Sequence, residues 1–354
     1  MATTWQGTVS RDQIIIVTQT DDPHADDVVL ALERMGHDPV RLNSDEIPAN
    51  AQISMRWNGE QPFEATIDVL SSGRAMAASQ VRSVWWRRPG FFGLPDDLSV
   101  QEAEFATAEI EHALRSLWAC LDCYWVSEPD RIRRASWKGE QLLRAHRIGF
   151  DVPRTLVTTD PEQARQFFHE CGKKVVFKVM TDPTLGGISL SRKDPAVQVD
   201  PYAAVTTLIT ESDLDMLDSV RIAPCLFQEY VPKKLELRIT VIGDEIFAAE
   251  IHSQEHEETS VDWRNSYADI PYRVAALPQQ VADRCLELVR GYGLNFSAID
   301  MIVTPDDRYV FVENNPNGQF IFVEHKVPEL AMTDALAACL VRGASKPDAR
   351  PITG

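Results

Sequence analysis

Two short apolar segments near the C-terminus carry three side chains whose types suit a metal ion. Asp300 lies in the first segment, and Glu313 and Asn315 follow it by thirteen and fifteen positions, at the end of the second. A turn at Pro305 separates the segments, so they are expected to pair as a β-hairpin. Mg²⁺ prefers a few hard oxygen ligands plus substrate phosphates to a complete protein cage. The spacing therefore predicts a Mg²⁺ site beside a nucleotide, and an ordinary hairpin is the alternative.

Upstream residues could hold the phosphates of that nucleotide. Lys178 lies within an apolar strand, and lysine is seldom buried without a partner. A phosphate would supply the opposite charge, whereas an edge-strand lysine reaching into solvent is the alternative. Gly186 and Gly187 follow that strand. Paired glycines let backbone N–H groups approach phosphate oxygens, although the pair could also be a simple turn.

The next segments offer groups for the nucleoside. One expected strand ends with Gln228, Glu229, Tyr230 and Val231. Its backbone could present an N–H and a C=O to an adenine edge, or it could be only a strand end. Glu236 and Arg238 alternate on the following strand, so both side chains point to one face. A carboxylate there could accept ribose hydroxyls and an arginine could grip a carboxylate or phosphate, with a cross-strand ion pair as the alternative.

Other familiar site motifs are missing or weak. The chain has no Walker A sequence, and the pair Gly291 and Gly293 lacks the third glycine of a dinucleotide fingerprint. Cys120 and Cys123 form a single C-x-x-C pair, for which free thiols are the favoured interpretation. The pair His252 and His256 suits a mobile polar loop better than a zinc site. A bound triphosphate would therefore need another architecture.

Composition limits the class of protein. The chain has 354 residues, 44% hydrophobic residues and a net charge of −18. Its length predicts two or three domains, and its charge argues against general nucleic-acid binding. The N-terminus lacks a signal-peptide pattern, and no apolar run approaches the roughly 18 residues of a membrane span. A cytoplasmic protein with no membrane or nucleic-acid partner is expected.

Strands alternate with helices in the first third of the chain, which predicts an α/β domain over residues 1–128. Strands are expected at 13–18, 40–42, 52–57, 63–69, 81–88 and 124–127, and helices at about 24–35 and 99–121.

Two further blocks follow. Residues 129–231 are expected to form a small α+β lid, and residues 232–344 an antiparallel-sheet domain. In the lid, helices are expected at about 130–147, 161–170 and 202–218, and strands at 155–158, 174–180 and 226–231. In the last block, strands are expected at 235–242 and 245–253, and helices at 278–291 and 328–342, beside the metal-bearing hairpin. Residues 345–354 are expected to be a disordered tail.

The order of these candidates resembles the ATP-grasp superfamily. The ordered set comprises Lys138, Lys178, Gly186, Gly187, Gln228–Val231, Glu236, Arg238, Asp300, Glu313 and Asn315. The blocks Val84-Trp-Trp-Arg-Arg-Pro89, Pro224 to Gly243 and Asp262-Trp-Arg264 look like those of the microviridin-type peptide maturases, the graspetide synthetases. The resemblance implies an ATP-grasp fold, with an α/β N-terminal domain, a central lid and a C-terminal antiparallel sheet. It also implies that ATP is held between the last two.

The resemblance implies an ATP-dependent ligase. In that family an Asp or Glu carboxylate of a ribosomally made precursor is phosphorylated to an acyl phosphate. A Thr or Ser hydroxyl or a Lys amine then displaces the phosphate and closes an ester or amide ring. Mg²⁺ would bind Asp300, Glu313 and Asn315, while Lys138 and Lys178 hold phosphates under the Gly186–Gly187 loop. Arg238 and Arg264, with Lys178, are then the candidate catalytic residues for the transferred phosphoryl group and the acceptor carboxylate.

The resemblance also implies a peptide partner and a homodimer. A helical leader segment of the precursor would dock on the central domain. The acidic residues Glu211, Asp213 and Asp215 are the candidate contacts to a leader arginine, with a solvated acidic face as the alternative. Arg87 and Arg88 are candidates for the substrate side of the N-terminal domain, or for surface arginines.

Two other functions remain open at this stage. A carboxylate–amine ligase acting on a free amino acid, a small peptide or a protein C-terminus would use the same ATP site. A non-catalytic peptide-binding module would be expected to have lost metal-site residues. For the metal site itself, an Asp300→Asn change is expected to relieve repulsion between carboxylates when the metal is absent, and so to impair turnover far more than folding.

Overall fold

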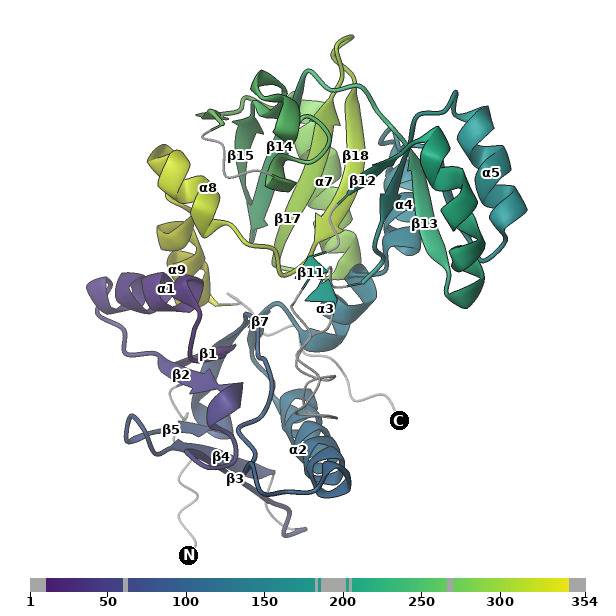
Figure 1. Cartoon of the computed structure of the whole chain (residues 1–354). Coiled ribbons are helices and arrows are strands. Elements are labelled where there is room, and N and C mark those ends of the chain that lie inside the picture. The colour runs from purple at the N-terminus through teal and green to yellow at the C-terminus, as the bar shows by residue number, and fades with distance from the viewer. Residues whose placement is uncertain are drawn as a thin grey trace, which may run out of the picture.

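The computed structural model describes residues 11–59, 63–181, 184–185, 202–203, 206–265 and 270–343. Three groups of elements follow one another along the chain (Figure 1). Within the described part of the chain, no helix combines the length and the apolar character needed to cross a membrane.

The N-terminal group is built on a four-stranded parallel sheet in the order β2-β1-β6-β7. The elements are β1 (Gln13–Thr18), α1 (Pro23–Arg34), β2 (Val40–Asn43), β6 (Val81–Trp86), α2 (Val100–Cys120) and β7 (Tyr124–Val126). A separate antiparallel sheet contains β3 (Ala51–Arg56), β4 (Glu64–Val69) and β5 (Arg74–Ala77), with the 3-10 turns η1 (Ser44–Glu46) and η2 (Ala78–Gln80) beside it. The continuous apolar run of β1 is buried, as both faces of its sheet are covered.

The middle group, to which we give the name lid, contains a four-stranded antiparallel sheet in the order β12-β9-β13-β8. Its elements are α3 (Pro129–Ala135), α4 (Lys138–Ile148), β8 (Thr155–Thr158), α5 (Pro161–Glu170), β9 (Val175–Lys178), β12 (Thr207–Ile209), the 3-10 helix η3 (Glu211–Ile222) and β13 (Cys225–Glu229). The short strands β10 (Thr184–Leu185) and β11 (Tyr202–Ala203) pair with each other. A small apolar core lies between one face of the lid sheet, α5 and η3.

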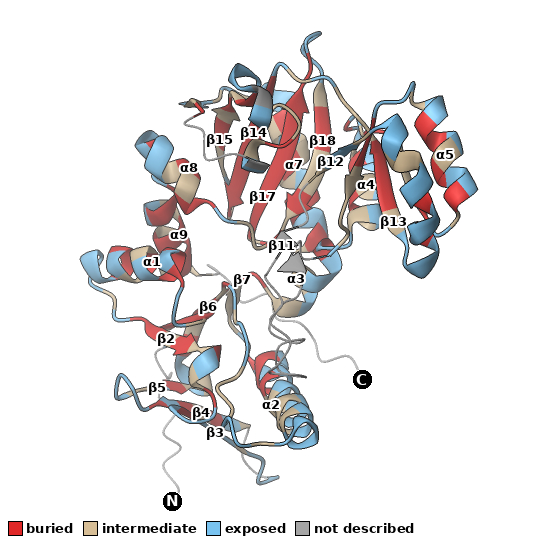
Figure 2. Cartoon of the chain, in the orientation of Figure 1, coloured by how far each residue is buried: buried red, intermediate tan, exposed pale blue. Residues whose placement is uncertain are grey.

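The C-terminal group is a five-stranded antiparallel sheet in the order β16-β15-β14-β17-β18. Its strands are β14 (Leu235–Ile242), β15 (Glu245–Ile251), β16 (Tyr272–Val274), β17 (Phe296–Val303) and β18 (Tyr309–Asn315). The turns η4 (Ser253–Glu255), η5 (Glu257–Thr259) and η6 (Trp263–Asn265) follow β15, and α7 (Gln279–Tyr292) packs on one sheet face. The chain ends with α8 (Ile321–Lys326), η7 (Pro328–Leu330) and α9 (Met332–Arg342). Figure 2 shows β14 and β17 buried along almost their whole length.

The last helices return to the first sheet. One hydrophobic core joins β1, β6 and α1 to α8 and α9, and α1 lies beside α9 in Figure 1. Ser83 Oγ on β6 donates a hydrogen bond of 2.9 Å to the carbonyl of Leu340 on α9. The end of the chain therefore packs on the N-terminal group, although it follows the C-terminal sheet in sequence.

Three expected helices are wrong in extent. The helix expected at 130–147 is two helices, broken at Ser136 and Trp137, and the one expected at 328–342 is a 3-10 turn followed by α9. Residues 202–218 contain two short strands before η3 rather than one helix. The strands β5 and β16 and the helix α8 were not predicted. They are short, so they show no long periodic pattern, and packing against the rest of the fold stabilises them.

Gln141 explains the break between α3 and α4. Its Nε2 donates to the carbonyls of Ala135, at 2.7 Å, and Asn314, at 2.8 Å, and its Oε1 accepts from the Asn314 N–H at 3.0 Å. The buried amide thus satisfies a carbonyl freed by the break and fixes α4 to β18. Lys138, at the first position of α4, is thereby held beside the end of β18.

A buried polar cluster joins the N-terminal group to the loop after Asn315. Asp22 accepts from Thr18 Oγ1 at 2.6 Å and lies 3.3 Å from Arg87 Nε, and Arg87 Nη1 donates to the carbonyl of Asn317 at 3.0 Å. His24 Nε2 accepts the N–H groups that begin α8. The expectation that Arg87 lines the substrate side is wrong, because it is 1% exposed, whereas Arg88 does line the cavity described below.

His24 makes the stability of this junction depend on pH. Burial lowers the pKa of His24, the carboxylate of Asp22 opposes this effect and the charge of Arg87 adds to it. The depressed pKa means that the unfolded chain binds more protons than the folded one near and below the ordinary histidine value of about 6.5. Stability contributed by His24 is therefore complete above that value and is lost as pH falls through it.

We expect the free energy of unfolding to fall between about pH 7.5 and about pH 5, and His24→Gln to flatten this dependence because glutamine keeps an acceptor but does not titrate. Urea unfolding at a series of pH values measures both slopes. Equal slopes for the two proteins would contradict the assignment.

Candidate active site

A cavity of about 980 Å³ lies between the lid and the C-terminal sheet. Its walls come from β9 and β13 of the lid, from β14, β17 and β18, from the start of α4 and from the turn η6. All the site residues expected from the sequence line it, except for the glycine pair, the three leader contacts and Arg87. Gly186 and Gly187 lie outside the described residues.

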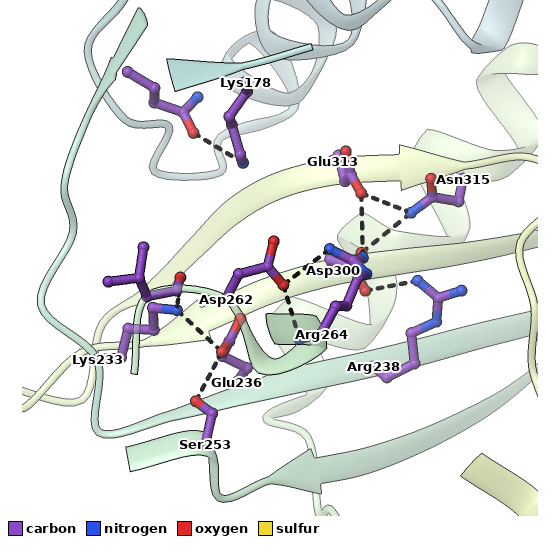
Figure 3. Close-up of polar contacts among 12 residues, drawn as sticks. Lys178, Lys233, Glu236, Arg238, Ser253, Asp262, Arg264, Asp300, Glu313 and Asn315 are labelled. Carbon is purple, nitrogen blue, oxygen red and sulfur yellow. Dashed lines mark hydrogen bonds and ion pairs between the residues drawn. The ribbon is translucent and has the colours of Figure 1, made fainter. Parts of the chain in front are cut away.

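The three expected metal ligands converge on one face of the hairpin. Asp300 on β17 pairs with Glu313 on β18, and directly opposed residues of antiparallel strands point to the same face. Asn315 follows by one alternation, and its Nδ2 lies 3.2 Å from both Asp300 Oδ2 and Glu313 Oε1. Two carboxylates and an amide therefore share one small volume (Figure 3).

Two arginines neutralise these carboxylates. Arg238 lies opposite Asp300 on β14, and its Nη1 donates to Asp300 Oδ1 at 2.7 Å. Arg264 Nη2, from η6, lies 3.0 Å from Asp300 Oδ2 and 3.6 Å from Glu313 Oε1. The expectation that an Asp300→Asn change relieves repulsion is therefore wrong, because Asp300 is the counter-ion of two guanidinium groups.

Two lysines complete a basic island in an otherwise acidic protein. Lys138 Nζ lies 3.2 Å from Glu313 Oε2 and donates to the carbonyl of Val179 at 2.8 Å. Lys178 Nζ donates to Gln228 Oε1 at 3.3 Å, and burial, reinforced by Lys138, lowers the pKa of Lys178. Burial alone would raise the pKa of Glu313, but the nearby cations Lys138, Arg264 and Lys178 hold it well below its usual range. Glu313 is therefore ionised, and the cations around it supply the positive charge that a phosphate-binding site requires.

Two backbone N–H groups at the junction between lid and sheet already have hydrogen-bond partners. The N–H of Glu229 is bonded to the carbonyl of Arg154 and that of Tyr230 to the carbonyl of Lys174, at 2.9 and 2.8 Å. A backbone N–H offered to adenine from this segment would therefore come from Val231, which also lines the cavity.

Glu236 has partners that the sequence did not reveal. Its Oε1 accepts from Lys233 Nζ at 3.0 Å and from Ser253 Oγ at 2.8 Å. The cross-strand ion pair that was the alternative is present for Arg238, which pairs with Asp300 on the neighbouring strand β17. Burial raises the pKa of Glu236, although Lys233 acts in the opposite direction. Lys233 itself is 4% exposed and also donates to the carbonyl of Val261.

The turn that carries Arg264 is fixed by a residue to which no role was assigned. Asp262 lines the cavity, and its Oδ1 accepts from the Arg264 N–H at 3.0 Å. The Arg264 guanidinium stacks 4.7 Å from the ring centre of Trp263, which in turn stacks on Phe322. The sequence block Asp262-Trp-Arg264 could have drawn attention to Asp262 and Trp263, but their contacts are seen only in the folded structure.

The loop after Asn315 packs tightly against Arg238. Arg238 Nη2 donates to the carbonyl of Gln319 at 2.6 Å, and a Cβ at Gly318 would lie 2.8 Å from that same nitrogen and 2.6 Å from Ala298 Cβ. Only glycine fits this approach without a shift. Arg238 is thereby held by Asp300 on one side and by the loop on the other.

The three candidate leader contacts lie on η3, away from the cavity. Glu211 pairs with Lys173, and Asp213 accepts from the N–H of Thr210 at 2.8 Å, which caps its own helix. Asp215 is exposed on the same 3-10 helix. The structure thus places all three on one lid element.

Comparisons with known proteins agree with this geometry. The MvdD pre-ATP-grasp domain family matches residues 13–133. The macrocyclase MdnC of Microcystis aeruginosa MRC, solved with its precursor peptide MdnA, has 30% identity and a TM-score of 0.80, over 93% of this chain and 99% of that one. A RiPP-associated ATP-grasp ligase of Chryseobacterium gregarium, solved with ADP and a leader and core peptide, has 30% identity and a TM-score of 0.81, over 93% and 96%.

A third structure, the macrocyclase MdnB of Microcystis aeruginosa MRC, has 28% identity and a TM-score of 0.76, over 93% of this chain and 99% of that one. No curated protein matches the chain at a significant level. The expected fold class, a mixed α/β and α+β ATP-grasp fold, is confirmed, as is the predicted family. The chain belongs to the microviridin-type macrocyclases, a family of RiPP-associated ATP-grasp ligases.

Proposed function

We propose that this chain is an ATP- and Mg²⁺-dependent peptide macrocyclase. It phosphorylates Asp or Glu side chains of a ribosomally made precursor and joins them to Thr or Ser hydroxyls or to Lys amines. The observation that carries the proposal is the pair Asp300 and Glu313, which line the cavity and form ion pairs with three cationic side chains, Lys138, Arg238 and Arg264. Two relatives with 30% identity contain peptides in their structures, which favours a peptide over a free amino acid as substrate.

The site residues fit a Mg²⁺ ion that phosphates complete. Asp300 and Glu313 supply carboxylates and Asn315 supplies an amide oxygen, all hard ligands. Among the residues that the structure describes, no group of three or more His, Cys, Asp and Glu side chains could hold a metal alone. When bound, the ion would polarise phosphate oxygens and offset their charge.

The positions of the cationic side chains indicate a separate role in binding for each. Lys138 and Lys178 face the cavity from the lid side and would hold phosphate groups. Arg238 is 4% exposed and fixed at both terminal nitrogens, so it would orient the transferred phosphoryl group or the acceptor carboxylate without reorganising. Arg264 reaches the same volume from η6. Enclosure between lid and sheet would keep water from the acyl phosphate, and positioning would supply much of the acceleration.

We further propose that the lid binds the leader segment through Glu211, Asp213 and Asp215. Glu211 and Asp213 would exchange their present partners for a leader arginine. A cytoplasmic homodimer completes the proposal. Six free cysteines agree with a reducing compartment, and light scattering measures the oligomeric state.

The decisive experiment incubates the protein with ATP, Mg²⁺ and the precursor peptide encoded beside its gene. Each ring formed removes one water, so the peptide mass falls by that amount per ring. An unchanged cognate peptide, together with a mass gain on a small amine acceptor, would identify a carboxylate–amine ligase instead.

Lys138→Met is expected to weaken ADP binding in the presence of Mg²⁺ by about ten- to a hundredfold, because one charge-assisted phosphate contact is lost. Calorimetric titration measures the dissociation constant. Lys234→Met is the matched control, since Lys234 forms an exposed pair with Asp307. Equal affinity of the Lys138 variant and the control would remove Lys138 from the phosphate site.

Gly318→Ala is expected to cost about 1–3 kcal/mol of stability and to lower turnover, because the new methyl group displaces Arg238 or the strand β17. Gly139→Ala is the control. No atom lies within 4 Å of its Cβ, and alanine within α4 should be neutral or stabilising. Thermal unfolding of both variants makes the comparison, and equal melting temperatures would contradict the packing argument.

A further inference from the structure

Arg264 and Arg238 bind Asp300 in different ways. Arg238 is buried within the sheet and holds Asp300 Oδ1, the inner oxygen that faces β14. The Arg264 side chain is 43% exposed, lies on a single 3-10 turn and contacts Asp300 Oδ2 and Glu313 Oε1. Arg238 is a fixed part of the sheet, whereas Arg264 approaches from a short turn at the edge of the cavity.

The oxygens that Arg264 contacts are those that a shared metal ion would use. Asn315 Nδ2 donates to the same two atoms, Asp300 Oδ2 and Glu313 Oε1. Two donor groups thus converge where a cation bridging both carboxylates would sit. A metal there would need the amide oxygen of Asn315 rather than its nitrogen, so the amide would rotate as well.

We infer that Arg264 is a built-in substitute for the metal ion, so that its guanidinium and a divalent cation bind Asp300 and Glu313 in mutually exclusive states. The inference rests on the proposed metal site and adds that metal binding must precede any contact of Arg264 with the substrate. Arg264 becomes available to a substrate carboxylate or phosphoryl group only after the metal has displaced it.

Charge supports the exclusion. Lys138 and Arg238 already neutralise the two carboxylates from other sides, so a divalent cation added beside Arg264 would place like charges in contact. Arg264 Nη2 lies 3.0 Å from Asp300 Oδ2 and 3.6 Å from Glu313 Oε1, so both carboxylates stabilise the guanidinium in this position in the absence of metal. Once a metal satisfies these carboxylates, that stabilisation is lost.

The surroundings of Arg264 also provide a reporter. Its guanidinium lies over the ring of Trp263, and Trp263 stacks on Phe322 at 5.2 Å between ring centres. Displacement of Arg264 removes a cation from the face of an indole, which changes the fluorescence of that tryptophan. Trp263→Phe isolates this contribution among the eight tryptophans of the chain.

The test uses Mn²⁺ alone, without nucleotide or peptide, and follows free Mn²⁺ by electron paramagnetic resonance. Arg264→Gln is expected to bind Mn²⁺ about tenfold more tightly than the unaltered protein, because the competing cation is gone. Arg290→Gln, which removes an exposed pair with Asp244, is the matched control and should leave affinity unchanged. Adding Mg²⁺, which is diamagnetic, should change the fluorescence of Trp263 in the unaltered protein but not in Arg264→Gln. Without metal, Arg264→Gln should unfold at a lower temperature than the control, and excess Mn²⁺ should restore it.

The variant Asp300→Asn distinguishes a failure of the proposed metal site from a failure of the proposed competition between Arg264 and the metal. If this variant binds Mn²⁺ as the unaltered protein does, the metal site itself is elsewhere and the proposed function loses its metal ligands. If Asp300→Asn abolishes binding but Arg264→Gln binds Mn²⁺ no more tightly than the unaltered protein, the substitution by Arg264 is overturned and the metal site stands.

Discussion

Two carboxylates at opposed positions of neighbouring strands are the constraint on which the site depends. Asp300 and Glu313 are largely enclosed, and buried carboxylates persist as anions only when cations and hydrogen bonds compensate them. The compensating side chains are Arg238 from β14, Lys138 from the start of α4, Lys178 nearby from β9 and Arg264 from η6. These elements belong to both the lid and the C-terminal sheet. The cations that stabilise the two largely enclosed carboxylates therefore also hold the lid against the sheet.

The N-terminal group takes part in this site through its contacts with the chain after Asn315. Arg87 holds the carbonyl of Asn317, and Asn317 Nδ2 donates to the carbonyl of Arg87. His24 receives the first N–H groups of α8, and α9 covers the parallel sheet. The loop between β18 and α8 is therefore fixed from both sides, by buried groups of the N-terminal domain and by Arg238. A change at Arg87 or His24 can thus alter the loop after Asn315, although 230 and 296 positions separate these residues from Asn317 and Phe320.

Local patterns in the sequence predicted those features that follow from strand alternation. The hairpin placed Asp300 and Glu313 together because opposed residues of paired strands share a face. Glu236 and Arg238 share a face because they alternate along one strand. The break before Lys138 could not be predicted in this way. It is stabilised by Gln141 reaching Asn314 across the fold, and local helical periodicity carries no trace of that contact.

The ion-pair partners of the charged side chains could likewise not be predicted from the sequence. Arginines 87 and 88 are adjacent, yet Arg87 is buried against Asp22 while Arg88 faces the cavity. The expected repulsion between Asp300 and Glu313 was wrong because Arg264 arrives from a separate turn, where the neighbouring Trp263 stacks on Phe322 of α8. Charge pairs formed between distant segments depend on tertiary geometry, which the spacing of residues along one segment does not encode.

The central claim is that the cavity between lid and sheet is where a metal–nucleotide complex meets a peptide carboxylate. A crystal structure with ADP, Mg²⁺ and the core segment of the precursor tests it most directly. The account predicts electron density for Mg²⁺ on Asp300, Glu313 and the Asn315 amide oxygen, with an acidic side chain of the peptide beside Arg238. Metal or nucleotide bound away from these residues, or a peptide whose carboxylates all lie outside the cavity, would contradict it.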